Sequence, residues 1–180
     1  MRKNHFVKKY YGAFRPCAGD IYIRGKNTKE MSVSGISKEV GYVMQNPDNQ
    51  LFTDSVYNET AFALKKMRLS KNKINELVKD ALLTVGLDDA DAHPHALNRT
   101  DRAKLVIACV LAMGSKIIIL DEVDAGSDYQ GSKEIMKIIQ NLQKKGFTII
   151  FITHNMFLAD KYANRLIKME RNGVVFDDRR

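Results

Sequence analysis

Aliphatic residues gather in two short runs in the second half of the chain. The first is IIIL at residues 117–120, and the second is IIFI at residues 149–152. Near-continuous aliphatic strands are typical of parallel sheets that are buried on both faces. Between the two runs, KEIMKIIQNLQKKG at residues 133–146 repeats apolar positions at helical spacing and closes on lysines and a glycine. The pattern predicts a βαβ unit with a right-handed crossover and a parallel sheet.

Further apolar patterns precede this unit. VGYVMQ at residues 40–45 predicts a short strand that ends at Gln45, just before an Asn-Pro-Asp turn. From residue 56 to residue 87 the apolar positions recur at helical spacing, and Gly86 suits a C-terminal cap. A strongly apolar helix is expected from about residue 102 to residue 113.

The two flanking regions alternate apolar and polar positions. Residues 19–27 read as one half-exposed strand between glycines. Residues 165–176 read as a last strand that turns at Asn172-Gly173. The whole pattern therefore predicts an α/β fold class, with a parallel sheet, flanking helices and a helical subdomain at about residues 46–100.

Composition narrows the class of protein. A chain of 180 residues fits one domain spanning residues 1–180, and 44% hydrophobic with 28% charged residues is ordinary for a globular protein. No apolar run approaches the roughly 20 residues that span a membrane, and MRKNHFVKKYY lacks the apolar core of a signal peptide. Cys17 and Cys109 are too few for a disulfide framework, so we expect a reduced, cytoplasmic protein.

The net charge of +8 permits binding to nucleic acid, acidic lipid headgroups or polyphosphates. Lys and Arg are, however, interleaved with acids along the chain, and no aromatic ribonucleoprotein signature is present. A solvated basic surface explains this charge better than a nucleic-acid site does.

Polar side chains stand where three of the predicted strands end. These are Gln45, the pair Asp121 and Glu122, and His154. Ligands of open parallel sheets bind beyond the carboxyl ends of the strands, so these groups suit a magnesium-bound phosphate and an attacking water. Taken singly, an acidic pair after a strand often belongs to a helix N-terminus capped by a residue such as Asp124 or Ser127, and a lone histidine is usually a surface residue. Their joint occurrence favours a shared site.

Four segments, in order, resemble motifs of the ATP-binding subunits of ATP-binding-cassette (ABC) transporters. VGYVMQNPDNQLF resembles the Q-loop, ALNRTDRAKLVIACVLAMGSK stands in the place of the signature motif and its helix, IIILDEVDAGSDYQG resembles Walker B with the D-loop, and IIFITHNM resembles the switch-histidine strand. The first segment is similar to the Q-loop segment of energy-coupling-factor importers. These importers bring vitamins or metal ions such as cobalt or nickel into prokaryotic cells. The resemblance implies a P-loop NTPase-like sheet with a partial antiparallel edge.

The resemblance assigns a role to each strand-tip residue. Gln45 would contact magnesium and the attacking water, and Asp121 would hold magnesium. Glu122 would polarise the water that attacks the γ-phosphate of ATP, and His154 would contact that phosphate. Asp128 would stabilise a dimer interface near the nucleotide of the partner.

The resemblance also implies partners and a location. ATP and Mg²⁺ would lie between this chain and a second ABC ATPase subunit, identical or different. The helical subdomain at about residues 46–100 would dock on a transmembrane coupling subunit, which in turn works with a substrate-binding membrane subunit. Within it, Asp48 is an expected acidic contact for a basic coupling helix. The protein would then be peripheral on the inner face of the cell membrane.

Two motifs depart from the family pattern. No segment matches the phosphate loop G-x-x-x-x-G-K-S/T, and alignment puts Lys3 where the loop lysine belongs. We therefore expect a chain whose N-terminal strand and phosphate loop are missing. The signature L-S-G-G-Q is also altered, and side chains stand where glycines allow close backbone approach. The residues at these positions are Leu97, Asn98, Arg99, Thr100 and Asp101.

These departures leave three functions open. The first is an impaired ABC ATPase subunit, whose hydrolysis by itself is in doubt. The second is a non-catalytic partner that docks on a membrane subunit and pairs with an intact ATPase. The third is a basic nucleic-acid-binding or regulatory fragment, which a steep salt dependence of DNA affinity would indicate.

Overall fold

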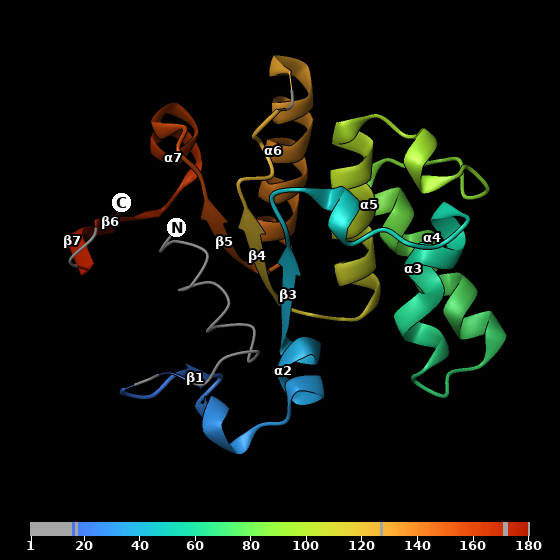
Figure 1. Cartoon of the computed structure of the whole chain (residues 1–180), viewed down its shortest axis with the longest axis horizontal. Helices are drawn as coiled ribbons and strands as arrows, with labels where there is room; N and C mark the ends of the chain where they lie inside the picture. The colour runs from blue at the N-terminus through green and yellow to red at the C-terminus, as the bar shows by residue number, and fades with distance from the viewer. Residues whose placement is uncertain (1–15, 17, 127, 171–172, 180) are drawn as a thin grey trace.

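Three parallel strands form the central sheet of the computed structural model, which describes residues 16, 18–126, 128–170 and 173–179 (Figure 1). The strands are β3 (Val40–Val43), β4 (Ile117–Asp121) and β5 (Thr148–Ile152), in the order β3-β4-β5. Their register pairs Val43 with Leu120, and Asp121 with Ile152. The predicted α/β fold with a parallel sheet is confirmed, and the carboxyl ends of all three strands lie at one edge.

Helix α6 (Tyr129–Lys144) connects β4 to β5 and completes the predicted βαβ unit. Its buried face carries Ile135, Ile139 and Leu142, which have the spacing expected of an amphipathic helix. The residue before the helix is Asp128, whose side chain accepts a hydrogen bond from the backbone N–H of Gly131. Asp128 is therefore the N-cap, and Asp124 is not, whereas Ser127 lies outside the described residues.

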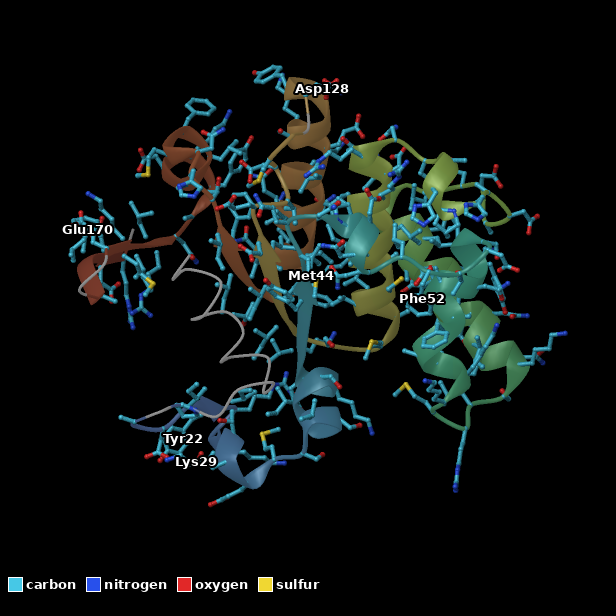
Figure 2. The ribbon with its side chains drawn as sticks, in the orientation of Figure 1. Tyr22, Lys29, Met44, Phe52, Asp128 and Glu170 are labelled. Atoms are coloured by element: carbon cyan, nitrogen blue, oxygen red, sulfur yellow. The ribbon has the colours of Figure 1, made fainter. Side chains whose placement is uncertain are left out.

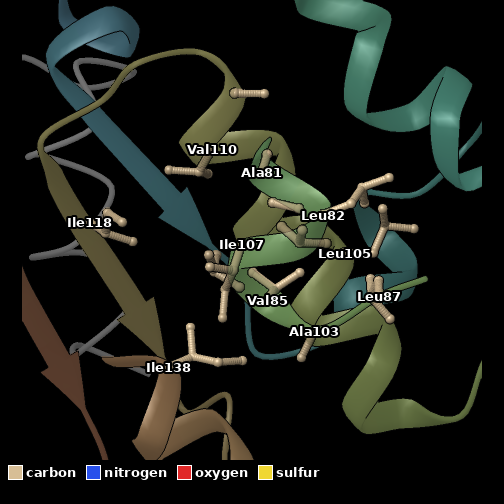
Figure 3. Close-up of a cluster of buried hydrophobic side chains, with 14 of the residues drawn as sticks. Ala81, Leu82, Val85, Leu87, Ala103, Leu105, Ile107, Val110, Ile118 and Ile138 are labelled. Carbon is tan, nitrogen blue, oxygen red and sulfur yellow. The ribbon is translucent and has the colours of Figure 1, made fainter. Parts of the chain in front are cut away.

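One face of the sheet carries the main hydrophobic core (Figure 3). Helix α5 (Arg99–Ala112) lies against this face and buries Leu105 and Ile107 next to Ile118 of β4. A Cβ atom added at Gly41 of β3 would come within 1.9 Å of the Val110 side chain. Glycine is thus required for α5 to approach the sheet this closely.

Helices α3 (Val56–Lys65) and α4 (Lys71–Val85) pack on α5, at the right of Figure 1, and are called the helical lobe here. Helix α4 ends at Gly86, in the left-handed conformation that the sequence predicted for a C-terminal cap (φ 72°). Helix α5 begins at Arg99, three residues before the expected start, because the Asn98 side chain caps it by accepting from the N–H of Asp101.

A smaller cluster covers part of the opposite face of the sheet. It joins Ile23 and Ile36 to Val40, Tyr42 and Ile119. Ile36 belongs to α2 (Val33–Glu39), and Ile23 to the short antiparallel pair of β1 (Tyr22–Ile23) and β2 (Lys26–Asn27). The single strand expected over residues 19–27 is therefore wrong, because the chain reverses there.

The last described segments lie beyond β5. They are α7 (Met156–Tyr162), β6 (Arg165–Glu170) and β7 (Gly173–Arg179). Strands β6 and β7 pair antiparallel into a hairpin that projects from the rest of the molecule, where Figure 2 labels Glu170. Strand β5 is half-exposed, contrary to the burial that its aliphatic run predicted. Both β3 and β5 are edge strands of the described sheet, but only β3 is fully buried.

Candidate active site

Glu122 lies at the centre of a cluster formed by the tips of the three parallel strands. Its Oε2 accepts a hydrogen bond of 2.9 Å from Nε2 of Gln45, which follows β3. Its Oε1 lies 2.8 Å from Nε2 of His154, which follows β5. The three residues that the sequence placed at neighbouring strand tips are thus in direct contact.

The backbone of Glu122 is in the left-handed region, with φ of 50°. For a residue with a side chain this conformation costs about 1–3 kcal/mol and persists only where the surrounding contacts hold it. Here the N–H of Glu122 donates to the carbonyl of Ile152 at 2.8 Å, and its own carbonyl accepts from the N–H of Ala125 at 2.9 Å. Both bonds fix the turn that directs the carboxylate toward Gln45 and His154.

Asp121 differs from Glu122 in being almost fully buried, with 4% of its surface exposed. Its Oδ2 accepts a hydrogen bond of 2.6 Å from the hydroxyl of Tyr42 on β3. Burial and this hydrogen bond raise the pKa of the Tyr42 phenol well above its ordinary value, so the hydroxyl remains a donor. The sequence pattern gave no signal for Tyr42, because the register of β3 on β4 sets its place on the same face as Asp121.

No lysine or arginine among the described residues pairs with Asp121. A buried carboxylate without a cation is costly, and oxygen ligands are those that Mg²⁺ prefers. The donor set at the strand tips, with Asp121, Glu122 and the amide of Gln45, therefore fits a magnesium ion held largely through water.

A second carboxylate fixes the tip of β5. Asp124 Oδ2 accepts from the hydroxyl of Thr153 at 3.0 Å, and that hydroxyl accepts from the N–H of Asn155 at 2.9 Å. These bonds hold the residues on both sides of His154. The other oxygen of Asp124 is buried and has no hydrogen-bond partner. From the sequence alone, Asp124 is predicted to be no more than a possible helix cap.

The loop after β3 is held by its own side chains. Gln50 accepts from the N–H of Met44 at 2.7 Å and donates to the carbonyl of Tyr42 at 3.0 Å. Arg102 of α5 pairs with Asp48 at 2.8 Å, so Asp48 already has a basic partner within the chain. The position of Gln45 therefore depends on contacts from both sides of the loop.

The residues in the signature position lie at the start of α5. The Asn98 side chain accepts from the backbone N–H of Asp101 and donates to the Asp101 carboxylate, which also accepts from Lys104. The carbonyl of Leu97 accepts a hydrogen bond from Nε of Arg102. Thr100 lies so close to Gly131 of α6 that an added Cβ would come within 2.2 Å of its hydroxyl.

Arg99 is turned toward its own chain. Its Nε donates to the carbonyl of Ala125 at 2.9 Å, and its Nη2 donates to the carbonyl of Gln45 at 3.2 Å. Asp128 lies at the exposed start of α6 (Figure 2) and caps that helix. Lys3, which the sequence placed as the phosphate-loop lysine, lies outside the described residues.

A sequence model described as ABC transporter matches residues 3–125, more than half of the chain. The chain belongs to the ABC transporter family. In this ABC ATP-binding domain, the matched part contains the loop of Gln45, the start of α5 and the carboxylate pair.

Curated relatives agree with the family. A protein named as an ABC transporter ATP-binding protein of Pyrococcus furiosus is 38% identical over 175 residues, which is 97% of this chain and 67% of the relative. A protein with the same description from Methanosarcina acetivorans is 38% identical over 167 residues, covering 92% of this chain and 27% of the relative. The chain thus spans about two thirds of the first relative and about a quarter of the second.

Two solved structures share the fold. CbiO1 from Clostridium perfringens, described as part of the ABC transporter complex CbiONQ, has a TM-score of 0.91 and 32% identity, over 98% of this chain and 72% of that one. The ATP-binding cassette MJ0796, solved as a dimer bound to ADP and Pi, has a TM-score of 0.84 and 19% identity, over 98% of this chain and 80% of that one. The second likeness concerns the fold alone. Among the described residues, no helix is both long and apolar enough to cross a bilayer.

Proposed function

We propose that this chain is the ATP-binding subunit of an energy-coupling-factor importer, which couples ATP hydrolysis to the uptake of a vitamin or a metal ion. The observation that carries the proposal is the contact of Gln45 and His154 with the two carboxylate oxygens of Glu122. The likeness to CbiO1 and the segment VGYVMQNPDNQLF support the importer type.

Glu122 is the residue that would orient and polarise the attacking water. Its side chain is 18% exposed, so one part of the carboxylate faces solvent while Gln45 and His154 fix its direction. A carboxylate held in this way accepts a hydrogen bond from a water molecule and thereby raises the nucleophilicity of that water. Bound Mg²⁺ would neutralise charge on the phosphates. His154, which is 68% exposed, would contact the γ-phosphate and exchange its bond to Glu122 for one to the substrate.

Gln45 would hold magnesium together with Asp121 and report the state of the site to the helical lobe. A chain of contacts supports this route. The loop that begins at Gln45 ends at Phe52 and Thr53, whose N–H groups donate to the buried carboxylate of Glu59 in α3 at 2.9 and 2.8 Å. Movement of the loop would therefore be transmitted to α3 through hydrogen bonds to a charged group, which are stronger than neutral ones.

The helical subdomain at about residues 46–100 would dock on the transmembrane coupling subunit. Phe52 and Phe62 support this assignment, because they are 63% and 39% exposed and pack edge to face, with ring centroids 4.7 Å apart. Figure 2 shows Phe52 beside the helices of the lobe. Exposed aromatic pairs of this kind are typical of interface anchors. Bound there, the protein would be peripheral on the inner face of the membrane.

A second candidate function, a non-catalytic partner of an intact ATPase, is favoured by the signature position. ABC domains of this family form dimers, and a dimer of the ATP-binding cassette MJ0796 has been solved. In this chain, Asn98, Arg99 and Asp101 direct their side chains to their own helix and loops. Such a start of α5 would serve the partner's nucleotide less well than glycines do.

Co-purification from detergent-solubilised host membranes tests the proposal. The tagged wild-type chain should retain a transmembrane subunit and a second ATP-binding subunit, both identified by mass spectrometry. Phe52→Asp should lose the transmembrane subunit, because it puts a charge on the exposed aromatic pair. Phe176→Asp, on the exposed face of β7, is the matched control and should keep it. A wild-type chain that recovers nucleic acid and no membrane subunit would contradict the proposal.

A further inference from the structure

The guanidinium group of Arg99 joins two loops that are 80 residues apart in the sequence. Nε donates to the carbonyl of Ala125, in the turn after Glu122, and Nη2 donates to the carbonyl of Gln45. The two acceptors are backbone groups, so the contacts do not depend on which side chains those positions carry. The planar guanidinium, with its rigid set of donors, is suited to bridging two separate acceptors.

These contacts close a ring around Glu122. Arg99 holds the Gln45 carbonyl, the Gln45 amide donates to the Glu122 carboxylate, and the Glu122 carbonyl accepts from the N–H of Ala125. The Ala125 carbonyl then accepts from Arg99 and completes the ring. Every member is bound on both sides, and displacement of one loop therefore displaces the other.

Arg99 is the member of the ring that lies at the start of α5, and this start is held in place by contacts with α6. Lys104 is buried and donates from Nζ to Glu134 of α6 at 2.6 Å and to Asp101 at 2.9 Å. The guanidinium also packs against Gly126, where an added Cβ would lie 2.9 Å from Nε. The small residue at that point leaves room for the arginine.

We infer that Arg99 is a positioning residue that holds Gln45 against Glu122, and that it acts within its own chain and not as a ligand of phosphate. This rests on the proposed role of Glu122 in hydrolysis, which it deepens. One of the residues that alter the signature is thereby assigned a function.

Hydrogen–deuterium exchange of the purified 180-residue chain tests the contact without nucleotide. Arg99→Ala should speed exchange at residues 44–50 and 122–126 by about threefold to tenfold, as expected for the loss of surface hydrogen bonds. Arg99→Lys should restore only part of the protection, because one ammonium cannot bridge both carbonyls. Unchanged exchange in Arg99→Ala would overturn the inference.

Arg165→Ala is the matched control. Arg165 donates two hydrogen bonds to Asp177 in the β6–β7 hairpin, so its loss also removes two arginine contacts. Exchange at residues 44–50 and 122–126 should not change in this variant. Arg99→Gln, which keeps a polar donor, replaces Arg99→Ala if the latter fails to fold.

A double-mutant cycle with Gln45→Ala separates positioning from general loosening. Arg99 and Gln45 belong to one ring, so the double variant should speed exchange at residues 122–126 by less than the product of the factors measured for the two single variants. Independent, multiplicative effects would overturn the inference.

Steady-state hydrolysis by the co-purified complex separates a positioning role from phosphate binding. Arg99→Ala should lower kcat by about threefold to tenfold and leave KM for Mg-ATP unchanged. A raised KM with unchanged kcat would assign Arg99 to phosphate binding and overturn the inference. If instead the proposed function is wrong, turnover of the complex will be the same in Glu122→Gln as in wild type, which is a different result from either outcome for Arg99.

Discussion

At the scale of single residues, the site depends on carboxylates in different environments. Asp121 is buried and accepts from Tyr42, whereas Glu122 reaches partly into solvent between Gln45 and His154. Groups of the same chemical type can therefore serve different roles, one as a ligand of a cation and one toward water. The left-handed backbone of Glu122 is part of this arrangement, because it turns adjacent carboxylates in different directions.

Tyr42→Phe tests the support of Asp121. Removal of the hydroxyl leaves a buried carboxylate oxygen without its donor, and we expect the free energy of unfolding in urea at pH 7 to fall by about 1–3 kcal/mol. Tyr129→Phe, on an exposed ring, should change it by less than about 0.5 kcal/mol. Equal free energies of unfolding for wild type and Tyr42→Phe would show that the hydrogen bond to Asp121 does not stabilise the fold.

The pKa of Tyr42 also predicts a pH dependence. Because the pKa is raised in the folded state above its ordinary value of 10.0, the contribution of the phenol is complete below that pH and is lost as pH rises beyond it. The difference in unfolding free energy between wild type and Tyr42→Phe should therefore be constant from pH 7 to about 9.5 and shrink at higher pH. A difference that grows with pH would contradict the assignment.

At the scale of elements, the sequence predicted the helices and strands that have a regular spacing of apolar residues. The strands at residues 40–45 and 117–121, helix α6 and the cap at Gly86 follow from hydrophobic periodicity and local residue preferences. The tips of parallel strands meet at one edge by geometry, which is why Gln45, Glu122 and His154 could be grouped beforehand.

Features that depend on tertiary contacts could not be predicted in this way. The bond from Tyr42 to Asp121 joins residues 79 positions apart, and those of Arg99 join loops on either side of α5. Likewise, the aliphatic run of β5 predicted burial on both faces, which depends on neighbours that the run itself does not specify. Position in the folded sheet, and not local pattern, decides these features.

Gly41→Ala tests the close packing of α5 on β3. The added Cβ would overlap the Val110 side chain, so we expect a loss of about 1–3 kcal/mol in the free energy of unfolding. Val110→Ala removes the overlapping atoms, and Gly41→Ala/Val110→Ala should therefore lose less than the sum of the two single losses. Additive losses in urea denaturation would show that this contact does not limit the helix position.

At the scale of the whole molecule, the charge at the strand tips bears on how the proposed site would bind a nucleotide. Carboxylates dominate the strand tips, and they repel a polyphosphate unless a cation lies between. The sequence contains no match to the phosphate loop, whose N–H groups bind phosphates in this family.

We therefore expect the isolated 180-residue chain to show a melting shift near zero with millimolar Mg-ATP. A complete site at 100 times its dissociation constant would add about 2.7 kcal/mol, which corresponds to roughly 5–10 °C for a domain of this size. An upward shift that is lost in Lys3→Ala or Asp121→Asn would show that the chain binds nucleotide by itself.

Hydrolysis by the assembled complex tests the central claim most directly. The complex that co-purifies with this chain is prepared with the catalytic carboxylate of its other ATP-binding subunit replaced by an amide, so that only the site built on Glu122 remains. At saturating Mg-ATP, we predict measurable turnover that falls by about 100-fold or more in Glu122→Gln and is retained in Glu76→Gln, an exposed carboxylate of α4. Turnover that Glu122→Gln leaves unchanged, or a wild-type complex with none, would contradict the account.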